Sequence, residues 1–481
     1  MSISINYQDY IVVFAYIVPV FSLSLYSSKP LKTKDDLNAT DQYLANKSLT
    51  FTESLCSIIA TEVSALTFIG IPAFAYTKDF SFIQVYFGAI WGRIIIAKVI
   101  LPRLYDKGLT VYGIMSSENS TAGGLRSVSS IYMINKLLSV GVRLYSGSIL
   151  IAEFFNIHIY YALFTICFIT FFYTLIGGLK AVVRTDIAQM GLFVIGGITA
   201  HILIPQISNQ SWSEMMLQAS VAGKLTWIDF SAPGPFIAGF FGGILFDIGT
   251  HGVDQDYIQR LIANKSLKSA QRAIISSAFM SIMIGFLFLS IGALLWSHYQ
   301  SVTPPEGVEA DYLFAYFITH YFPFGLKGLM VAGALAATMS TLDSSLNALS
   351  SCLYNDFFPK RQSHKMSYYY KIDNLIIISL LFFISIAASK SNGLLELGLK
   401  IASWTGGTLI ALFASKLLMQ KWISYKLNFI NVYGCYLFGL TGVYINNIAL
   451  GWSWWWNVYF GTAFSLLFIF ISNKIFKYKI N

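Results

Sequence analysis

The stretch Ala337–Asn347 reads ATMSTLDSSLN and decides the fold of this 481-residue chain. Six of its last eight residues are polar, although the surrounding segment is apolar and long enough to cross a bilayer. Polar groups are costly in a spanning helix unless they face protein, water or an ion. Ser340 and Ser344 share one helix face. Thr341 and Ser345 share the adjoining face. The stretch is therefore predicted to be a tilted or buried helix whose hydroxyls line a site.

The chemistry of this hydroxyl cluster indicates its ligand. Hydroxyls together with a few backbone carbonyls form a hard-oxygen site of low formal charge. Such a site suits a monovalent cation better than Ca²⁺ or Mg²⁺, which prefer several carboxylates. The alternative interpretation is that the hydroxyls bond back to their own helix or hold neighbouring helices together.

The composition of the whole chain is that of a membrane protein. The residues are 56% hydrophobic and only 11% charged, whereas a soluble domain carries about 25% charged residues. The net charge of +9 comes from short loops between apolar runs, so nucleic acid is not an expected partner. The four cysteines have no metal or redox spacing and are expected to be small core residues. The segment 11–27 is expected to be a retained first span rather than a signal peptide.

Apolar segments predict about thirteen transmembrane helices, since a bilayer core of about 30 Å needs roughly 20 helical residues. They lie near 9–27, 51–76, 81–101, 127–155, 157–178, 184–205, 234–257, 271–297, 323–354, 371–390, 394–419, 428–447 and 454–475.

Loop charges predict the orientation. Lysines and arginines, such as Lys29, Arg103, Lys268 and Arg361, concentrate in alternate loops. The positive-inside rule then places the N-terminus outside and the C-terminus in the cytoplasm. The expected location is the plasma membrane, the inner membrane in a bacterium.

This orientation allows two inverted five-helix units. The predicted parts are 1–50 (first helix and loop), 51–210 (first unit), 211–422 (second unit) and 423–481 (two final helices). The first helix of each unit contains helix breakers, which can expose backbone groups to ions and substrate. The alternative is that the glycines only permit close packing. The breakers are Gly70, Pro72, Gly242, Gly243, Gly249 and Gly252.

Several charged residues stand inside predicted spans. Glu62 and Asp247 are candidates for binding substrate hydroxyls or an amine, because intramembrane carboxyls are functional candidates by default. Arg143 suits a carboxylate, either of the substrate or of Glu62 and Asp247. Arg93, Lys98 and Lys136 are expected to snorkel toward the cytoplasmic interface. His251 is expected to be a structural histidine.

Several motifs resemble the sodium/solute symporters, a family of glucose, proline, iodide, vitamin and sialic acid carriers. The resemblance covers nearly all of the chain. It depends on the serine-rich stretch above and on four further motifs: Ser64–Gly70 (SALTFIG), Gly177–Val182 (GGLKAV) with Thr185 and Asp186, His251–Asp256 (HGVDQD), and Gln259 with Arg260. It implies an all-α membrane protein with the inverted five-plus-five repeat of the leucine-transporter type.

The resemblance also implies sodium ligands. One Na⁺ ion would be bound by carbonyls of Ala60, Val63 and Ala337 with hydroxyls of Ser340 and Thr341. A second ion, present in some members, would be bound by Asp186, Ser340, Asp343 and Ser344. Asp343 replaces a hydroxyl residue of the family pattern, so this second site is either strengthened or altered. Asp186 could instead form an ion pair with Arg184 or another cytoplasmic cation.

The substrate is expected between the two broken helices. The matching positions are Glu62, Ser64, Thr67, Tyr86, Asp247, Thr250 and Ser281. Arg143 lies on the helix that carries a carboxylate-binding arginine in sialic acid carriers.

The predicted function is sodium-coupled import of a small polar solute by alternating access. A sugar, a polyol or an acid sugar such as sialic acid is the first choice, and an amino acid, vitamin or monocarboxylate is the alternative. A channel or a membrane sensor fits less well, because a sensor needs a soluble output domain. The motifs of an enzyme, with a catalytic set of side chains, are not found.

Overall fold

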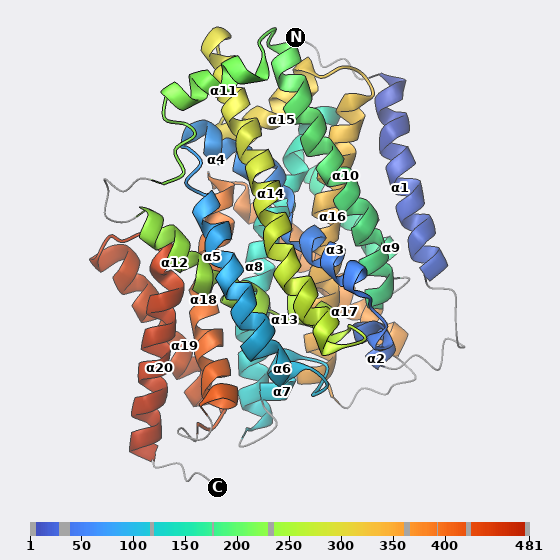
Figure 1. The fold of residues 1–481 in the computed structure, drawn as a ribbon. Helices are drawn as coiled ribbons and strands as arrows, with labels where there is room; N and C mark the ends of the chain where they lie inside the picture. Colours follow the sequence, from blue (N-terminus) through green and yellow to red (C-terminus); the bar gives the residue numbers. More distant parts are fainter. Residues whose placement is uncertain are drawn as a thin grey trace.

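The computed structural model describes residues 6–27, 39–115, 120–175, 178–228, 235–359, 366–391, 393–419 and 425–476. Within these ranges the secondary structure consists of helices (Figure 1). The β-type pairing in the described residues is limited to two isolated bridges. Gly177 and some loop cations, such as Lys29 and Arg361, lie outside the described residues. The described helices therefore establish an all-α protein.

The first half of the chain contains these elements: α1 (Tyr7–Ser27), α2 (Ala39–Leu44), η2 (Ala45–Lys47), α3 (Phe51–Glu62), η3 (Leu66–Gly70), α4 (Ile71–Thr77), α5 (Ile83–Ile95), η4 (Ile96–Ile100), α6 (Leu101–Leu104), α7 (Val111–Met115), α8 (Ala122–Phe155), α9 (Ile159–Thr174), α10 (Gly178–Ile207) and α11 (Trp212–Val221).

The second half contains α12 (Pro235–Asp247), η5 (Ile248–Gly252), α13 (Gln255–Ile262), α14 (Leu267–Ser301), α15 (Ala310–Tyr321), α16 (Leu326–Cys352), η6 (Leu353–Phe357), α17 (Met366–Ala388), α18 (Leu394–Phe413), η8 (Ala414–Leu418), α19 (Phe429–Tyr444), η9 (Ile445–Ala449), η10 (Trp454–Trp456) and α20 (Asn457–Phe476).

Eight helices among the described residues are long and apolar enough to cross a membrane. The bent pair Phe51–Glu62 and Leu66–Thr77 makes a ninth if it is one span. Each of these nine coincides with a predicted span. The other four predicted segments correspond to shorter or interrupted helices, namely α1, α9, α12 with η5 and α13, and α19 with η9. The described helices therefore fit a multi-pass membrane protein.

The first broken helix is α3, which ends at Glu62 and resumes through the π-helical η3 into α4, bent by 57°. Thr50 begins α3 with a capping box: its side chain accepts from the Glu53 amide, and the Glu53 carboxylate accepts from the Thr50 amide. Pro72 then stands in the first turn of α4, where its missing amide hydrogen is not needed. The break exposes backbone groups near the middle of the molecule.

The second broken helix runs from α12 through η5 to α13. Asp254 begins α13 by accepting a hydrogen bond from the Asp256 amide at 2.8 Å. The glycines of this region are packed tightly: a Cβ on Gly243 would lie 2.6 Å from the Val85 carbonyl oxygen of α5. Close packing thus explains Gly243, as the alternative interpretation proposed, and it coexists with a real helix break.

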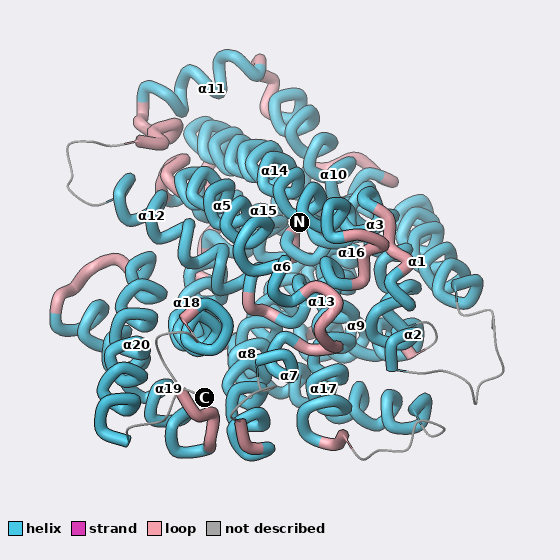
Figure 2. Tube along the Cα trace, turned by 60° about the horizontal axis from the view of Figure 1, so that its bottom comes forward, coloured by secondary structure: helices cyan, strands magenta, loops and turns pink. Residues whose placement is uncertain are grey.

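The hydroxyl-rich stretch lies in α16, at the centre of the bundle (Figure 1). In the most apolar part of this span, 94% of the residues are buried. This confirms the expectation that the helix is enclosed by protein. Helices α3, α8, α10 and α1 pack around α16. Helices α1 and α20 lie on opposite sides of the bundle in both views (Figures 1 and 2).

Candidate functional site

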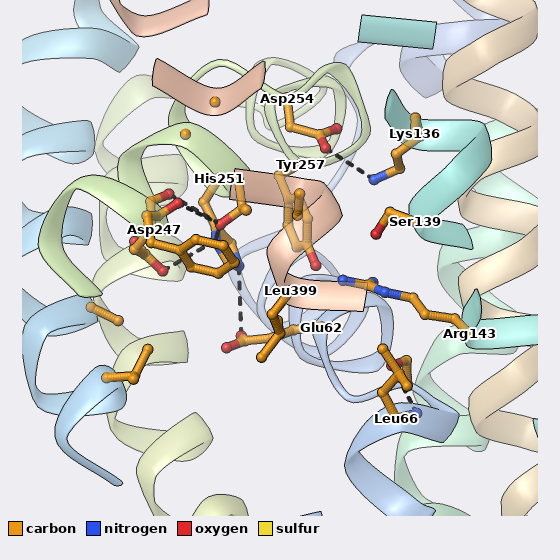
Figure 3. A pocket seen from close by; sticks show the side chains of 18 of the residues that line it. Glu62, Leu66, Lys136, Ser139, Arg143, Asp247, His251, Asp254, Tyr257 and Leu399 are labelled. Atoms are coloured by element: carbon orange, nitrogen blue, oxygen red, sulfur yellow. Dashed lines mark hydrogen bonds and ion pairs between the residues drawn. The ribbon is translucent and has the colours of Figure 1, made fainter. Parts of the chain in front are cut away.

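A central cavity of about 110 Å³ lies where the breaks after α3 and α12 meet α8 and α18. It is lined by seven of the eight residues predicted to contact substrate: Glu62, Ser64, Thr67, Tyr86, Arg143, Asp247 and Thr250 (Figure 3). Ser281 stands beside the cavity, and its hydroxyl donates to Glu62 Oε2 at 2.7 Å. The fold thus gathers around one space residues that are far apart in the sequence.

Arg93 of α5 binds both carboxylates of the cavity. Its side chain is fully buried, with Nη2 2.7 Å from Glu62 Oε1. Its Nε donates to Asp247 Oδ1 at 3.2 Å, and Nη1 donates to Ser277 at 2.7 Å. The expectation that Arg93 snorkels toward the interface is therefore wrong. A guanidinium inside a membrane needs counter-charges, and two intramembrane carboxylates supply them without reaching the headgroups.

His251 completes this cluster. Its Nδ1 lies 3.1 Å from Asp247 Oδ1, and its Nε2 lies 3.7 Å from Glu62 Oε2. The imidazole also packs on the Tyr257 ring, with 4.0 Å between centroids. His251 is therefore fully partnered, in agreement with the structural interpretation, although it also lines the cavity.

Arg143 differs from Arg93 in having no ion pair or hydrogen bond with its side chain among the described residues. It extends from α8 into the cavity, with its guanidinium toward Tyr257 (Figure 3). Its buried Nε has no hydrogen-bond partner among the described residues. Glu62 and Asp247 were expected either to bind substrate or to pair with Arg143, and the structure pairs both of them with Arg93 instead of Arg143. A carboxylate entering the cavity would therefore meet a guanidinium that is available.

Lys136 also lines the cavity, about two helical turns before Arg143 on the same face of α8. It is buried, and its Nζ lies 3.1 Å from Asp254 Oδ2 and 2.9 Å from Asp256 Oδ2. The expectation that Lys136 snorkels is therefore wrong, because two carboxylates at the start of α13 neutralise it inside the bundle. Unlike Arg143, it is already committed to protein partners.

The predicted residues of the first sodium site surround a small void between α3, α10 and α16. Ala60, Val63, Ala337 and Ser340 line this void. Thr341, the fifth predicted ligand, is buried nearby, and its hydroxyl donates to the Ala337 carbonyl oxygen at 3.0 Å. Four of the five residues thus share one space, although they come from helices far apart in the chain.

The break after α3 releases backbone oxygens beside this void. In an uninterrupted helix the Ala60 carbonyl would accept from the Ser64 amide and the Val63 carbonyl from the Thr67 amide. Here the Ser64 amide donates to Glu62 O at 3.0 Å, and the Thr67 amide donates to Ser64 O at 2.8 Å. The amides that normally satisfy Ala60 and Val63 are therefore used elsewhere, which leaves carbonyl oxygens suited to a hard cation.

The residues of the second predicted sodium site form a buried carboxylate cluster next to the first. Ser340 donates to Asp186 Oδ1 at 2.5 Å, and Ser57 donates to Asp186 Oδ2 at 2.5 Å. Arg260 Nη2 lies 3.6 Å from Asp186 Oδ2, so Asp186 forms an ion pair with a basic residue, as in the alternative interpretation. All three charged or hydroxyl partners of Asp186 are buried.

Asp343 and Ser344 extend the cluster along α16. The Ser344 hydroxyl donates to Asp343 Oδ1 at 3.3 Å, and Tyr173 donates to Asp343 Oδ2 at 2.5 Å. Arg260 also donates to Ser344. In this part of the described structure two cations face four carboxyl groups. Lys136 pairs with Asp254 and Asp256. Arg260 pairs with Asp186 and Asp256 and contacts Asp343 through the Ser344 hydroxyl. With all four carboxyls ionised, the cluster carries an excess of negative charge.

The sequence interpretation missed the partners that organise these sites. Arg93 carried the same intramembrane signal as Glu62 and Asp247, so the rule applied to the carboxylates would have found it. Arg260 was noticed only as part of a motif. Tyr257, whose ring packs on His251 and lies between it and Arg143 in Figure 3, gave no signal, since an aromatic residue in a helix is ordinary.

Comparison with known proteins places these features in context. The family model described as "Sodium:solute symporter family" matches residues 42–424. The chain is 28% identical over 398 residues to the sodium/sialic acid symporter SiaT of Proteus mirabilis, covering 80% of this chain and 78% of that protein. It is 26% identical over 399 residues to the sodium-coupled monocarboxylate transporter 2 of Homo sapiens, covering 80% of this chain and 64% of that protein.

A solved structure has the same fold. It shows the substrate-bound outward-open state of a Na⁺-coupled sialic acid symporter, and the two chains match over 98% of each with a TM-score of 0.85 and 22% identity. At this level of identity the match establishes the helical arrangement.

Proposed function

We propose that this chain, which belongs to the sodium:solute symporter family, imports a small hydroxylated organic acid, with an acid sugar such as sialic acid as the first candidate. Members of this family are sodium-coupled transporters and not enzymes, so sodium and a small solute are its partners. The observation that carries the substrate proposal is the Arg143 guanidinium, which faces the cavity without a partner among the described residues.

The charge pattern of the cavity supports an anionic substrate. Glu62 and Asp247 are paired with Arg93, and Lys136 is paired with Asp254 and Asp256. Arg143 is therefore the cation on the cavity wall that remains for a ligand. A guanidinium binds a carboxylate through two parallel hydrogen bonds, which gives both affinity and orientation.

The remaining wall supports hydroxyl recognition. Ser64, Thr67, Ser139 and Thr250 present hydroxyl groups to the same cavity. A substrate with several hydroxyls would exchange hydrogen bonds with water for hydrogen bonds with these side chains. The alternative substrate, an amino acid, would place its ammonium group beside a carboxylate. Glu62 and Asp247 both pair with Arg93, and among their oxygens Asp247 Oδ2 is left without a hydrogen-bond partner in the described structure.

A monocarboxylate is the second candidate, and the size of the cavity favours it. A volume of about 110 Å³ suits a solute smaller than a complete acid sugar. An acid sugar needs a wider cavity, which alternating access would provide if α18 or the broken helices move apart. The relationship to a sodium-coupled monocarboxylate transporter supports the same candidate.

We further propose that sodium binds at the break of α3. The first ion would be held by carbonyls of Ala60, Val63 and Ala337 with hydroxyls of Ser340 and Thr341, and the void between α3, α10 and α16 supports this position. A second ion would be held by Asp186, Ser340, Asp343 and Ser344, a position supported by the excess negative charge there.

The transport cycle follows from these positions. Sodium at the break would fix α3 against α16 and so order Glu62, Ser64 and Thr67 on the cavity wall. It would then favour the outward-open form, since a ligand shifts an equilibrium only through its differential affinity. The proposed topology has about thirteen spans, with the N-terminus outside, the C-terminus cytoplasmic and inverted units at 51–210 and 211–422. A bacterial inner membrane is the proposed location.

Uptake into proteoliposomes tests this function. Labelled sialic acid, lactate, glucose, proline and a vitamin are offered to purified protein, with an inward gradient of sodium or of choline. We expect sodium-dependent uptake of a carboxylated solute, stimulated by an inside-negative potential worth about 2.3 kcal/mol per charge per 100 mV. Selective uptake of neutral glucose would contradict the role of Arg143, and uptake of lactate alone would favour the second candidate.

A further inference from the structure

Gln189 of α10 faces the void that we assign to the first sodium ion. Its side chain is 1% exposed, and it lines the same small space as Ala60, Val63 and Ser340. Its Oε1 atom has no hydrogen-bond partner among the described residues. A buried amide oxygen without a partner gives up its hydrogen bonds to water and receives none in return, so a ligand that it could bind would compensate for this loss.

Tyr16 fixes which end of this amide faces the void. Gln189 Nε2 donates to the Tyr16 hydroxyl oxygen at 3.1 Å. The Tyr16 hydroxyl in turn donates to the Met339 sulfur, 3.7 Å away. Because the hydroxyl hydrogen is used for Met339, Tyr16 accepts from the amide nitrogen. This assignment leaves Oε1 as the end of Gln189 that is not held by protein.

We propose that Gln189 Oε1 is a further ligand of the sodium ion bound at the break of α3, and that Tyr16 of α1 orients it. The inference rests on the proposed sodium site. A side-chain carbonyl is a hard oxygen of the kind that binds monovalent and divalent hard cations. A sodium ion there would give Gln189 Oε1 the partner that it lacks among the described residues. It would also add α10 and α1 to the helices that sodium holds together.

The contribution of an amide oxygen differs from that of a carboxylate. It adds a ligand without adding charge, so it tunes the size and number of ligands of the site rather than its overall attraction for cations. Selectivity between ions of the same charge depends on these properties. Removing Gln189 Oε1 should therefore change the preference for sodium over lithium as well as the affinity for sodium.

The test is a set of variants measured for sodium-dependent uptake at saturating substrate. Gln189→Leu removes the oxygen, and we expect the half-saturating sodium concentration to rise about tenfold, which corresponds to about 1.4 kcal/mol. Its preference for sodium over lithium should also change. Gln189→Glu keeps an oxygen in place, and we expect it to retain sodium affinity within about threefold. Tyr16→Phe should cause a smaller rise, because the amide loses its orienting partner. Gln206→Leu, an exposed position on the same helix, is the matched control.

Binding can be measured on purified protein when a variant transports poorly. Sodium raises the thermal unfolding temperature of a protein that binds it in the folded state only. We expect this rise to shrink in Gln189→Leu and to persist in Gln206→Leu. Equal sodium dependence of Gln189→Leu and the unchanged protein would overturn the inference.

Ser340→Ala separates this inference from the sodium site on which it rests. A loss of sodium affinity in Ser340→Ala with no effect of Gln189→Leu means that the site exists without Gln189. Unchanged sodium affinity in Ser340→Ala means that the site itself is misplaced.

Discussion

Arg93 Nη2 lies 2.7 Å from Glu62 Oε1, deep in the bundle and beside the break of α3. The same guanidinium reaches Asp247 beside the other broken helix, with Nε 3.2 Å from Oδ1. One arginine therefore ties together the two interrupted helices between which the solute is expected to bind. This arrangement leaves Arg143, on the opposite wall, available for a ligand.

Replacing Arg93 should destabilise the protein strongly. Arg93→Met leaves two buried carboxylates without their cation, and breaking a buried ion pair from one side costs about 3–5 kcal/mol. We expect a large fall in the thermal unfolding temperature of purified protein. The double variant Arg93→Met with Glu62→Gln should recover part of this loss, because one stranded charge is removed. A stability close to that of the unchanged protein would show that Arg93 is dispensable for folding.

Replacing Arg143 should weaken substrate binding while leaving the stability of the protein nearly unchanged. Arg143→Lys keeps the charge but loses the planar fork that binds a carboxylate. We expect the half-saturating substrate concentration to rise about tenfold or more, the equivalent of at least about 1.4 kcal/mol. Sodium affinity and thermal stability should change little, because Arg143 has no ion pair within the described structure to lose. Equal losses of sodium and substrate affinity would instead indicate a structural role.

Asp186→Asn tests the second sodium ion. Asp186 has buried hydroxyl partners and one cation, so the neutral amide should remain folded while the excess negative charge of the cluster falls. We expect the cooperativity of uptake with sodium concentration to fall to that of a single ion, and charge moved per solute to fall with it. Asp343→Asn should act in the same direction. Unchanged charge per solute in both variants would remove the second ion from the account.

Asp9 of α1 should stabilise the start of α16. Its Oδ1 accepts hydrogen bonds from the amides of Gly325 at 2.7 Å and Gly328 at 3.0 Å, where the first amides of α16 lack partners in their own helix. Loss of a helix cap costs about 0.5–2 kcal/mol, so Asp9→Ala should lower the unfolding temperature modestly. Asp9→Asn keeps an acceptor oxygen and should lower it less. Equal stability of the two variants would contradict the capping role.

The interior of the protein was the part best predicted from sequence. The hydroxyl stretch 337–347 indicated a buried helix, and it is enclosed on all sides. Of the predicted breakers, Gly70 follows the interruption between α3 and η3, and Gly252 directly precedes the interruption between η5 and α13. Glu62, Asp247 and Arg143 could be identified from sequence because a charged residue inside an apolar span stands out even when its partners are unknown.

The pairing of these charges could not be predicted. Spacing along one helix tells which residues share a face, but it does not tell which faces of α3, α5 and α12 meet. Arg93 and Lys136 were therefore assigned to the interface by their sequence position, whereas packing gave them carboxylates inside the bundle. Gln189 was missed for a related reason, since a single amide in an apolar helix gains meaning only when its neighbours are known.

Helix interruptions also obscure the number of membrane crossings. Interrupted segments such as α12 with η5 and α13 are apolar in sequence but fall short of a continuous spanning helix.

The most direct test of the central claim is sodium-driven uptake of a carboxylated solute by the purified protein in liposomes. The account predicts accumulation of labelled sialic acid, or of a smaller carboxylate, only under an inward sodium gradient. It also predicts that Ser340→Ala weakens the affinity for sodium measured at saturating substrate, and that Arg143→Lys weakens the affinity for substrate measured at saturating sodium. Uptake that proceeds equally well with choline in place of sodium would contradict the account.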